Sequence, residues 1–351
     1  MDRLAHGSAF VNNNNRLIGL TFDLKDTYLA AGYSEIEAAE FDRADTIDSI
    51  DEALRSLGYQ TDRIGNIKQL VSRLHNGDRW DLVFNICEGM HGIGREAQVP
   101  GLLDAYQIPY VFSDTVACAV TLHKGMTKDV VRAAGVATPD YAVVNQIADA
   151  EEIRMTFPLF AKPIAEGTSK GISARSKIND ATQLEEVCRD LLAQHGQPVL
   201  VERFLPGREF TVGIVGTGED AVALATMEIQ LSKGPHSEAY SYHNKANWEE
   251  LVHYSLLPAG ELRSAVEALS LQAWRALGCR DGGRIDVRLD ENGKPGFIEV
   301  NPLAGMHPQR SDLPMMAAMA NIPYARMLGM IMESAEKRIS EQATSASRQA
   351  A

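Results

Sequence analysis

The chain lacks several features that would assign it to a class at once. It has only four cysteines in 351 residues, and none of them forms a CxxC pair. No hydrophobic run approaches the length of a membrane span, and the first 16 residues contain no apolar signal-peptide core. We therefore expect buried free thiols in a reducing cytosol, a cytoplasmic location and no membrane partner.

Positive charge is also scarce. Lysine and arginine number 34 against 47 aspartates and glutamates, which gives a net charge of −13. An extended nucleic-acid surface needs an excess of positive charge, so we expect no nucleic-acid partner. With 45% hydrophobic and 23% charged residues the composition is that of a globular protein, and its length suffices for two or three domains.

The first third of the chain alternates between strand-like and helix-like segments. Residues 17–21 and 81–86 fit buried strands, residues 46–58 have apolar positions at helical spacing, and residues 98–106 form a second candidate helix. This alternation predicts an α/β domain with a parallel sheet covered on both sides. The polar, glycine-rich loop 85–96 follows a strand, where functional loops gather. It is either a substrate loop or a plain connection.

Two further loops are candidates for binding. Residues 166–171, EGTSKG, combine glycines with hydroxyl and lysine side chains and are suited to phosphate oxygens. They do not match the P-loop pattern, and a simple hairpin turn is the alternative. Residues 232–250 form a long polar stretch between strand-like regions, which is typical of a lid. We also expect helices at 122–134, at 260–277 and from Pro314 to about Met332, and strands at 157–163, 198–205 and 209–215.

The strongest local signal is a hairpin. Asn292-Gly293 separates two alternating runs, GGRIDVRLD and GFIEVNP, as a two-residue hairpin loop does. If Asn292-Gly293 is that loop, the register follows. The apolar face is then made by two cross-strand pairs, Val287 with Ile298 and Ile285 with Val300.

On the other face of this hairpin, Asp286 lies directly opposite Glu299, with Asn301 beside them. Like charges at such positions repel, and a cation between them removes the repulsion. Carboxylate and amide oxygens are hard ligands suited to Mg²⁺ held together with phosphate oxygens. The alternative is a solvated acid pair neutralised locally by Arg284 and Arg288.

Taken together, the motifs resemble the ATP-grasp ligases, specifically the D-alanine–D-alanine ligase type. The likeness runs from about Thr121 to Met332 and comprises, in chain order, Lys162, EGTSKG, ERFLPGREFTV, SYHNKA, GGRIDVRLD, EVNP and GMHPQRSDLP. It implies an α/β preATP-grasp domain followed by an α+β ATP-grasp module with two lobes and antiparallel sheets. The implied divisions are a flexible start (1–15), the N-terminal domain (16–121), the central lobe (122–201), the C-terminal lobe (202–333) and a flexible tail (334–351).

The resemblance also implies roles for single residues, with ATP and Mg²⁺ (or Mn²⁺) as cofactors. The implied ATP contacts are Lys124 and Lys162 on phosphates, Thr168 and Ser169 in the loop that closes over them, Glu202, Phe204 and Leu205 around adenine, and Glu209 on the ribose. The implied metal ligands are Asp286, Glu299 and Asn301. The implied catalytic groups are Lys245 in the lid, Arg284 and the Gly305 amide at the oxyanion, and Ser311 at the second substrate's carboxylate.

The implied reaction joins two small molecules. A carboxylate attacks the γ-phosphate of ATP, the resulting acylphosphate is attacked by an amine, and an amide or dipeptide forms. A lid would keep water away from the acylphosphate. The resemblance further implies a homodimer.

The substrate side departs from the family pattern. The N-terminal motif resembling GGxSxExxVS is absent, and Glu35, Glu37 and Glu40 are the candidate replacements. Ala246 follows the lid lysine where tyrosine is usual, Thr168 stands where serine is usual, and the first-domain loop reads EGMHGIGRE. His236 and His243 are either substrate contacts or solvated. The substrate pair therefore stays open: D-alanine twice, another pair, a non-ligating nucleotide- or metal-binding homologue, or a kinase that stops at phosphorylation.

Overall fold

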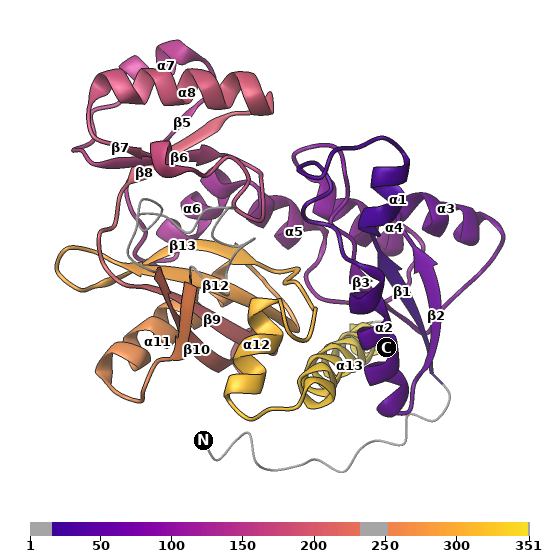
Figure 1. Ribbon diagram of the computed structural model, residues 1–351. Helices are drawn as coiled ribbons and strands as arrows, with labels where there is room; N and C mark the ends of the chain where they lie inside the picture. Colours follow the sequence, from indigo (N-terminus) through magenta and orange to yellow (C-terminus); the bar gives the residue numbers. More distant parts are fainter. Residues whose placement is uncertain (1–15, 232–251, 350–351) are drawn as a thin grey trace.

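The computed structural model describes residues 16–231 and 252–349, and in that part of the chain the strands form three sheets (Figure 1). A four-stranded sheet near the N-terminus is parallel. The other two sheets, of four and five strands, are antiparallel. The α/β and α+β class expected from the sequence is confirmed.

The N-terminal sheet has the order β2-β1-β3-β4. Its elements are β1 Leu17–Phe22, α1 Lys25–Ala30, α2 Ala44–Ser56, β2 Gln60–Gly65, α3 Ile67–His75, β3 Leu82–Ile86, the 3₁₀ turn η1 Arg95–Ala97, α4 Gln98–Ala105, β4 Tyr110–Val111 and α5 Thr115–Leu122. Helix α2 packs on one face of the sheet, and α3 and α4 pack on the other. This explains why β3 is buried at every residue. The four predicted segments are confirmed, whereas α1, β2, α3, β4 and α5 were not expected.

The second sheet, in the order β5-β8-β6-β7, lies under two helices at the top of Figure 1. Its elements are α6 Lys124–Ala133, β5 Tyr141–Val144, α7 Ile147–Glu151, β6 Leu159–Pro163, β7 Lys177–Ile178, α8 Ala181–His195 and β8 Val199–Arg203. Asp180 caps α8 by accepting a hydrogen bond from the Gln183 amide, and Gly196 ends it with a φ of +59°. The apolar side of α8, including Val187 and Leu191, packs against this sheet.

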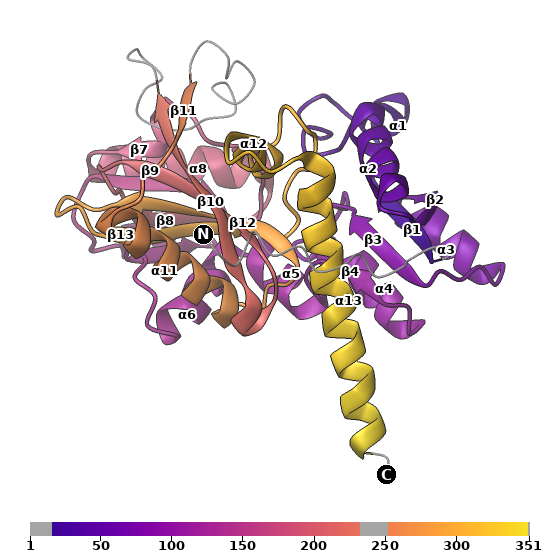
Figure 2. The ribbon, with the colours of Figure 1, turned by 90° about the horizontal axis from the view of Figure 1, so that it is seen from below.

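The third sheet has the order β11-β10-β9-β12-β13. Its elements are β9 Glu209–Val215, the 3₁₀ turn η3 Gly218–Asp220, β10 Val222–Leu231, β11 Val252–Leu256, α11 Glu261–Ala276, β12 Gly282–Leu289, β13 Pro295–Asn301, α12 Asp312–Met319 and α13 Tyr324–Gln349. Helix α11 covers one face, and α12 and α13 cover the other. Figure 2 shows α13 running between this sheet and the N-terminal sheet, and its apolar side belongs to a core shared by both.

The β12–β13 hairpin differs from the prediction in its turn. Strand β12 ends at Leu289 and β13 begins at Pro295, so the connection has five residues, 290–294, and not two. Within it the Asp290 amide donates to the Lys294 carbonyl at 2.9 Å. Val287 pairs with Phe297 and not with Ile298, which is the extra residue of a β-bulge. The longer turn shifts the register by one residue and the bulge shifts it back. The predicted pairs Ile285–Val300 and Asp286–Glu299 are therefore confirmed.

The C-terminal part is more ordered than expected. The single helix predicted after Pro314 is two helices, because Pro323 cannot lie inside a helix. The tail expected to be flexible from residue 334 is helical to Gln349. The reason is its anchorage: Ala335 is fully buried, and Arg338 forms a 2.7 Å ion pair with the buried Asp281.

Two expectations about the whole chain can be checked. All four cysteines, Cys87, Cys118, Cys188 and Cys279, are buried free thiols, as predicted. Within the described residues, no helix is both long and apolar enough to cross a membrane.

Candidate active site

Three adjoining cavities surround the β12–β13 hairpin. The aromatic cavity is lined by Phe160 and Phe204, the central cavity by Glu88 and Glu96, and the outer cavity by Ser311. Glu299 lines both the aromatic and the central cavity, and Thr168, Arg284 and Gly305 line both the central and the outer one. Every predicted site residue that lies in the described part of the chain lines at least one of them: Lys124, Lys162, Thr168, Ser169, Glu202, Phe204, Leu205, Glu209, Arg284, Asp286, Glu299, Asn301, Gly305 and Ser311.

The acid pair of the hairpin faces these cavities. Asp286 is paired with Glu299 across the two strands, and Asn301 Nδ2 lies 3.5 Å from Asp286 Oδ2. Arg284 contacts Asp286 at 3.3 Å but lies closer, at 2.6 Å, to Asp312. The predicted local neutralisation by arginine is thus partial. No group of three or more acidic, histidine or cysteine side chains suited to a metal occurs in residues 16–231 and 252–349.

A network of buried charges stands beside Glu299. Lys162, at the end of β6, lies 3.1 Å from Glu202 and 3.6 Å from Glu299. Lys124, the first residue of α6, lies 3.9 Å from Glu299 and donates to the Glu166 carbonyl at 2.6 Å. Burial lowers the pKa of Lys124, and Glu299 offsets only part of this. Burial also opposes the charge of Lys162, but Glu202 and Glu299 together raise its pKa.

Glu202 has a second cation, Lys128, that the sequence prediction missed. Lys128 Nζ lies 2.7 Å from Glu202 Oε2, with both side chains almost fully buried, and donates to Thr138 Oγ1 at 2.8 Å. Burial alone would raise the pKa of Glu202, yet Lys128 and Lys162 hold it below its ordinary value. The spacing was a usable signal, because Lys124 and Lys128 are four residues apart and share one side of α6.

The aromatic cavity lies between the second and third sheets. The Phe160 and Phe204 rings stack with centroids 6.4 Å apart, and the guanidinium of Arg288 lies 4.8 Å from the Phe204 ring centroid. Arg288 also faces Glu209 at 3.5 Å. Flat apolar walls with acids at the rim suit a planar, hydroxyl-bearing group such as a nucleoside.

The glycine-rich loop 166–171 belongs to the connection between the antiparallel strands β6 and β7, so it is not a tight turn. Thr168 and Ser169 have φ values of +48° and +56°. The loop is held by Glu40 of the N-terminal domain, which accepts from the Gly167 amide at 2.8 Å and pairs with Lys170 at 3.0 Å. The loop thus contacts both the cavities and the N-terminal domain.

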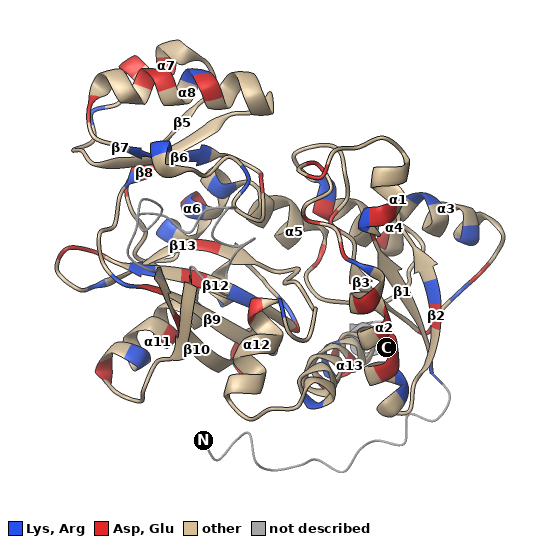
Figure 3. Ribbon diagram, in the orientation of Figure 1, with Lys and Arg blue, Asp and Glu red and all other residues tan. Residues whose placement is uncertain are grey.

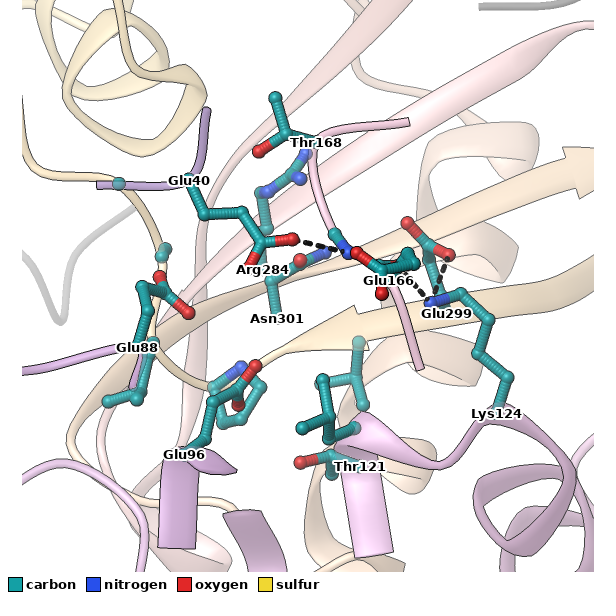
Figure 4. Close-up of a pocket in the computed structure, with 17 residues that line it drawn as sticks. Glu40, Glu88, Glu96, Thr121, Lys124, Glu166, Thr168, Arg284, Glu299 and Asn301 are labelled. Carbon is teal, nitrogen blue, oxygen red and sulfur yellow. Dashed lines mark hydrogen bonds and ion pairs between the residues drawn. The ribbon is translucent and has the colours of Figure 1, made fainter. Parts of the chain in front are cut away.

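Glu40 is the one of the three proposed replacement acids that reaches the site. It lines the central and outer cavities and pairs with Arg95 at 2.9 Å. Glu35 pairs with Lys25 at the surface, and the exposed Glu37 accepts hydrogen bonds from Ser34. The predicted loop 85–96 also reaches the central cavity, through Glu88 and Glu96 (Figure 4).

The outer cavity is formed by the segment between β13 and α12. Ser311, at the start of α12, accepts a hydrogen bond from the His307 amide at 3.0 Å. A side chain at Gly305 would place its Cβ 2.8 Å from Ser311 Oγ, so glycine keeps this approach open. Figure 3 shows both basic and acidic residues along the ribbon of the N-terminal domain and of the third sheet. The basic residues that line the outer cavity are Lys25, Arg43, Arg284, His307 and Arg310, and its acidic residues are Glu40, Asp42 and Asp312.

Four predictions fall on residues outside the described part of the chain. They concern the flexible start at 1–15, the lid at 232–250, its lysine Lys245, and the histidines His236 and His243.

Comparison with known proteins agrees with this arrangement. The family model described as D-ala D-ala ligase C-terminus matches residues 130–333. The D-alanine–D-alanine ligase of Aquifex aeolicus is 33% identical over 285 residues, which cover 81% of this chain and 92% of that protein. The ligase of the same name from Xanthomonas axonopodis pv. citri is 32% identical over 288 residues, covering 80% and 86%.

Solved structures share the fold. The VanG D-Ala:D-Ser ligase from Enterococcus faecalis superposes with a TM-score of 0.71 at 20% identity, covering 92% of this chain and 99% of that one. The D-alanine–D-alanine ligase from Bacillus anthracis complexed with ATP gives 0.68 at 21% identity, covering 93% and 99%. With sequence and fold in agreement, this chain belongs to the D-alanine–D-alanine ligase family of ATP-grasp enzymes.

Proposed function

We propose that this protein joins a carboxylate to an amine at the expense of ATP, through an acylphosphate. The observation that carries the proposal is that the candidate residues line three adjoining cavities that share walls. The aromatic cavity takes the nucleoside, the central cavity the carboxylate, and the outer cavity the amine. Because neighbouring cavities share Glu299, or Arg284 and Gly305, the three reactants meet at the hairpin.

The residues present fit a nucleotide with a divalent cation. Asp286, Glu299 and Asn301 offer only hard oxygen ligands, and three side chains leave several positions that phosphate oxygens and water complete, as Mg²⁺ requires. Lys124, Lys162 and the amides of the loop around Thr168 and Ser169 neutralise and position the phosphates. Phe204 and Leu205 hold the base with Glu202, and Glu209 accepts from the ribose hydroxyls. Mg²⁺, or Mn²⁺, supplies charge neutralisation when bound.

The chemistry then balances in two steps. A carboxylate oxygen bonds to the γ-phosphorus, the bond from that phosphorus to the bridging oxygen breaks, and ADP leaves. The amine nitrogen next attacks the acyl carbon, phosphate departs, and the nitrogen loses a proton. Arg284 and the Gly305 amide stabilise the oxyanion between these events, and Ser311 binds the second substrate. Lys245 is assigned to the transferring phosphate by family resemblance alone.

The names of the relatives make D-alanine the default for both substrates, and another amino acid or amine pair is the main competitor. A non-ligating homologue or a kinase has no use for the outer cavity, which disfavours both. Family resemblance supports a homodimer, a cytoplasmic location and no nucleic-acid or membrane partner. We keep the domain limits 16–121, 122–201 and 202–333, and we assign the helix after residue 333 to the C-terminal lobe.

The test uses the purified protein with Mg-ATP and pairs of D- and L-amino acids, measuring phosphate release and product mass. We expect release that depends on both members of a pair. Asp286→Asn should lower kcat at least about 100-fold and raise the Mg²⁺ concentration needed for nucleotide binding. Glu291→Gln, an exposed acid of the same hairpin, is the matched control. Unchanged activity and Mg²⁺ dependence in Asp286→Asn would remove the hairpin from the mechanism, and amine-independent ADP release would identify a kinase.

A further inference from the structure

The central cavity contains negative charge that its own surroundings do not balance. Arg95 and Lys170 are the nearby cations, and both are occupied: Arg95 by Glu40, and Lys170 by Glu40 and Glu166, at 2.8 to 3.0 Å. Two positive charges thus offset two negative ones. Lys124 is engaged by Glu299 and the Glu166 carbonyl, and Arg284 by Asp286 and Asp312.

Glu88 and Glu96 remain without a partner. Within the described residues neither side chain makes a hydrogen bond or ion pair, although Glu96 is only 9% exposed. Figure 4 shows both carboxyl groups pointing into the cavity, from the side opposite Lys124 and Glu299. A buried carboxylate without a cation is strongly disfavoured, so the buried Glu96, with the half-buried Glu88 on the same side of the cavity, indicates that a cation binds beside them.

The protonation of the two acids agrees with this. Burial raises the pKa of Glu96 to about 7, and Arg95 and Lys124 offset only part of the effect. Burial, with Glu96 and Glu40 nearby, raises the pKa of Glu88 well above its ordinary value. A raised pKa means that these carboxyl groups hold a proton more readily than a free glutamate does, and a bound cation would favour their ionised form.

We propose that the carboxylate substrate is an amino acid with a basic side chain, and that Glu88 and Glu96 bind its two cationic groups. This rests on the proposed function, because the cavity holds the carboxylate substrate only if the protein is a ligase of this kind. A substrate with one ammonium group, such as alanine, neutralises one of the two acids and leaves the other as a buried, unpaired carboxyl. A substrate with two cations pairs both.

The size and walls of the cavity fit such a molecule. Its volume is about 130 Å³, which at roughly 10–15 Å³ per water-sized group gives room for a free amino acid with a long side chain. Leu122 and Leu303 provide an apolar wall for the methylene groups of the side chain, and Arg284 and Gly305 stand where the carboxylate would react. A metal ion is a poorer occupant, because no third acidic, histidine or cysteine ligand joins Glu88 and Glu96 among the described residues.

The test compares donors that differ mainly in charge. Phosphate release and product mass are measured with lysine, ornithine or 2,3-diaminopropionate against norleucine and alanine, in both chiral forms, each with several acceptor amines. We expect kcat/KM to be at least tenfold higher for a basic donor. Glu96→Gln and Glu88→Gln should each raise the KM for the basic donor at least tenfold, while the KM for ATP changes less than twofold. Glu96→Asp should restore part of the loss.

The controls separate the possible outcomes. Glu37→Gln changes an exposed acid of the same domain and should leave every constant unchanged. A merely structural role of Glu88 and Glu96 would reduce turnover equally for basic and neutral donors, which overturns this inference. Equal kcat/KM for norleucine and ornithine overturns it as well and leaves the ligase proposal standing. Absence of amine-dependent phosphate release with every pair overturns the ligase proposal itself.

Discussion

Replacing Lys128 by methionine tests the buried charge network beneath the aromatic cavity. Lys128 is fully buried, and its ion pair with Glu202 is 2.7 Å long. This contact and the one with Lys162 hold the pKa of Glu202 below its ordinary value in spite of burial. Removing one partner of such a pair costs about 3–5 kcal/mol. Lys162 remains 3.1 Å from the other oxygen of Glu202, so we expect the lower end, about 3 kcal/mol.

Urea unfolding followed by tryptophan fluorescence measures this loss. Lys68→Met, an exposed lysine on α3, is the matched control and should change the free energy of unfolding by less than about 0.5 kcal/mol. The double variant Lys128→Met/Glu202→Gln should lose at least about 1 kcal/mol less than the sum of the single variants, because the two groups interact. A loss under 1 kcal/mol in Lys128→Met, or additive losses in the double variant, would refute the reasoning.

Two further outcomes are expected. The pKa of Glu202 is lowered in the folded protein, so its stabilising contribution is complete above about pH 4.3 and is lost as the pH falls through the lower folded pKa. The difference in unfolding free energy between the wild type and Glu202→Gln should therefore shrink between pH 5 and pH 2. A constant difference would contradict this. The four thiols are buried, and burial raises their pKa, for Cys188 to about 11 and for Cys279 to about 12. A thiol reagent at pH 8 should therefore react with none of them in the folded protein and with all four after denaturation. Rapid reaction without unfolding would show that solvent reaches at least one of them.

The acid pair of the hairpin could be predicted because its two residues are close in sequence and lie on adjacent strands. Asp286 and Glu299 face each other across one hairpin, so alternation and a turn signal were enough to pair them. The prediction reached the correct pair by an incorrect turn. A five-residue connection and a bulge at Ile298 compensate each other, and no local pattern distinguishes that combination from a two-residue loop.

Contacts between distant segments could not be predicted in this way. The tail after residue 333 is small and polar, which favours disorder in isolation, yet Arg338 finds a buried partner in Asp281. Likewise the spacing of Lys124 and Lys128 places both on one side of α6, but the partner of Lys128 could not be predicted from it, because Glu202 reaches Lys128 from β8. In each case the deciding interaction joins residues more than fifty positions apart, and burial of a charge is recognisable only when both are placed.

The substrate side shows the same limit, with a functional consequence. Glu40 comes from the connection between α1 and α2, Glu88 from the loop after β3, and Glu96 from the following 3₁₀ turn. No single motif unites them, and the family's N-terminal glutamate motif is absent.

Glu40 is used to hold Lys170 and the Gly167 amide, so it anchors the phosphate loop and leaves the cavity to Glu88 and Glu96. Because one residue contacts that loop and also borders the carboxylate cavity, a substrate that rearranges Glu40 also alters the loop over the phosphates. We therefore expect carboxylate recognition and nucleotide closure to be coupled through Glu40. Glu40→Gln should weaken both, measured as a rise in the KM for ATP together with that for the donor. A rise in only one of the two constants would show that the coupling runs through other residues.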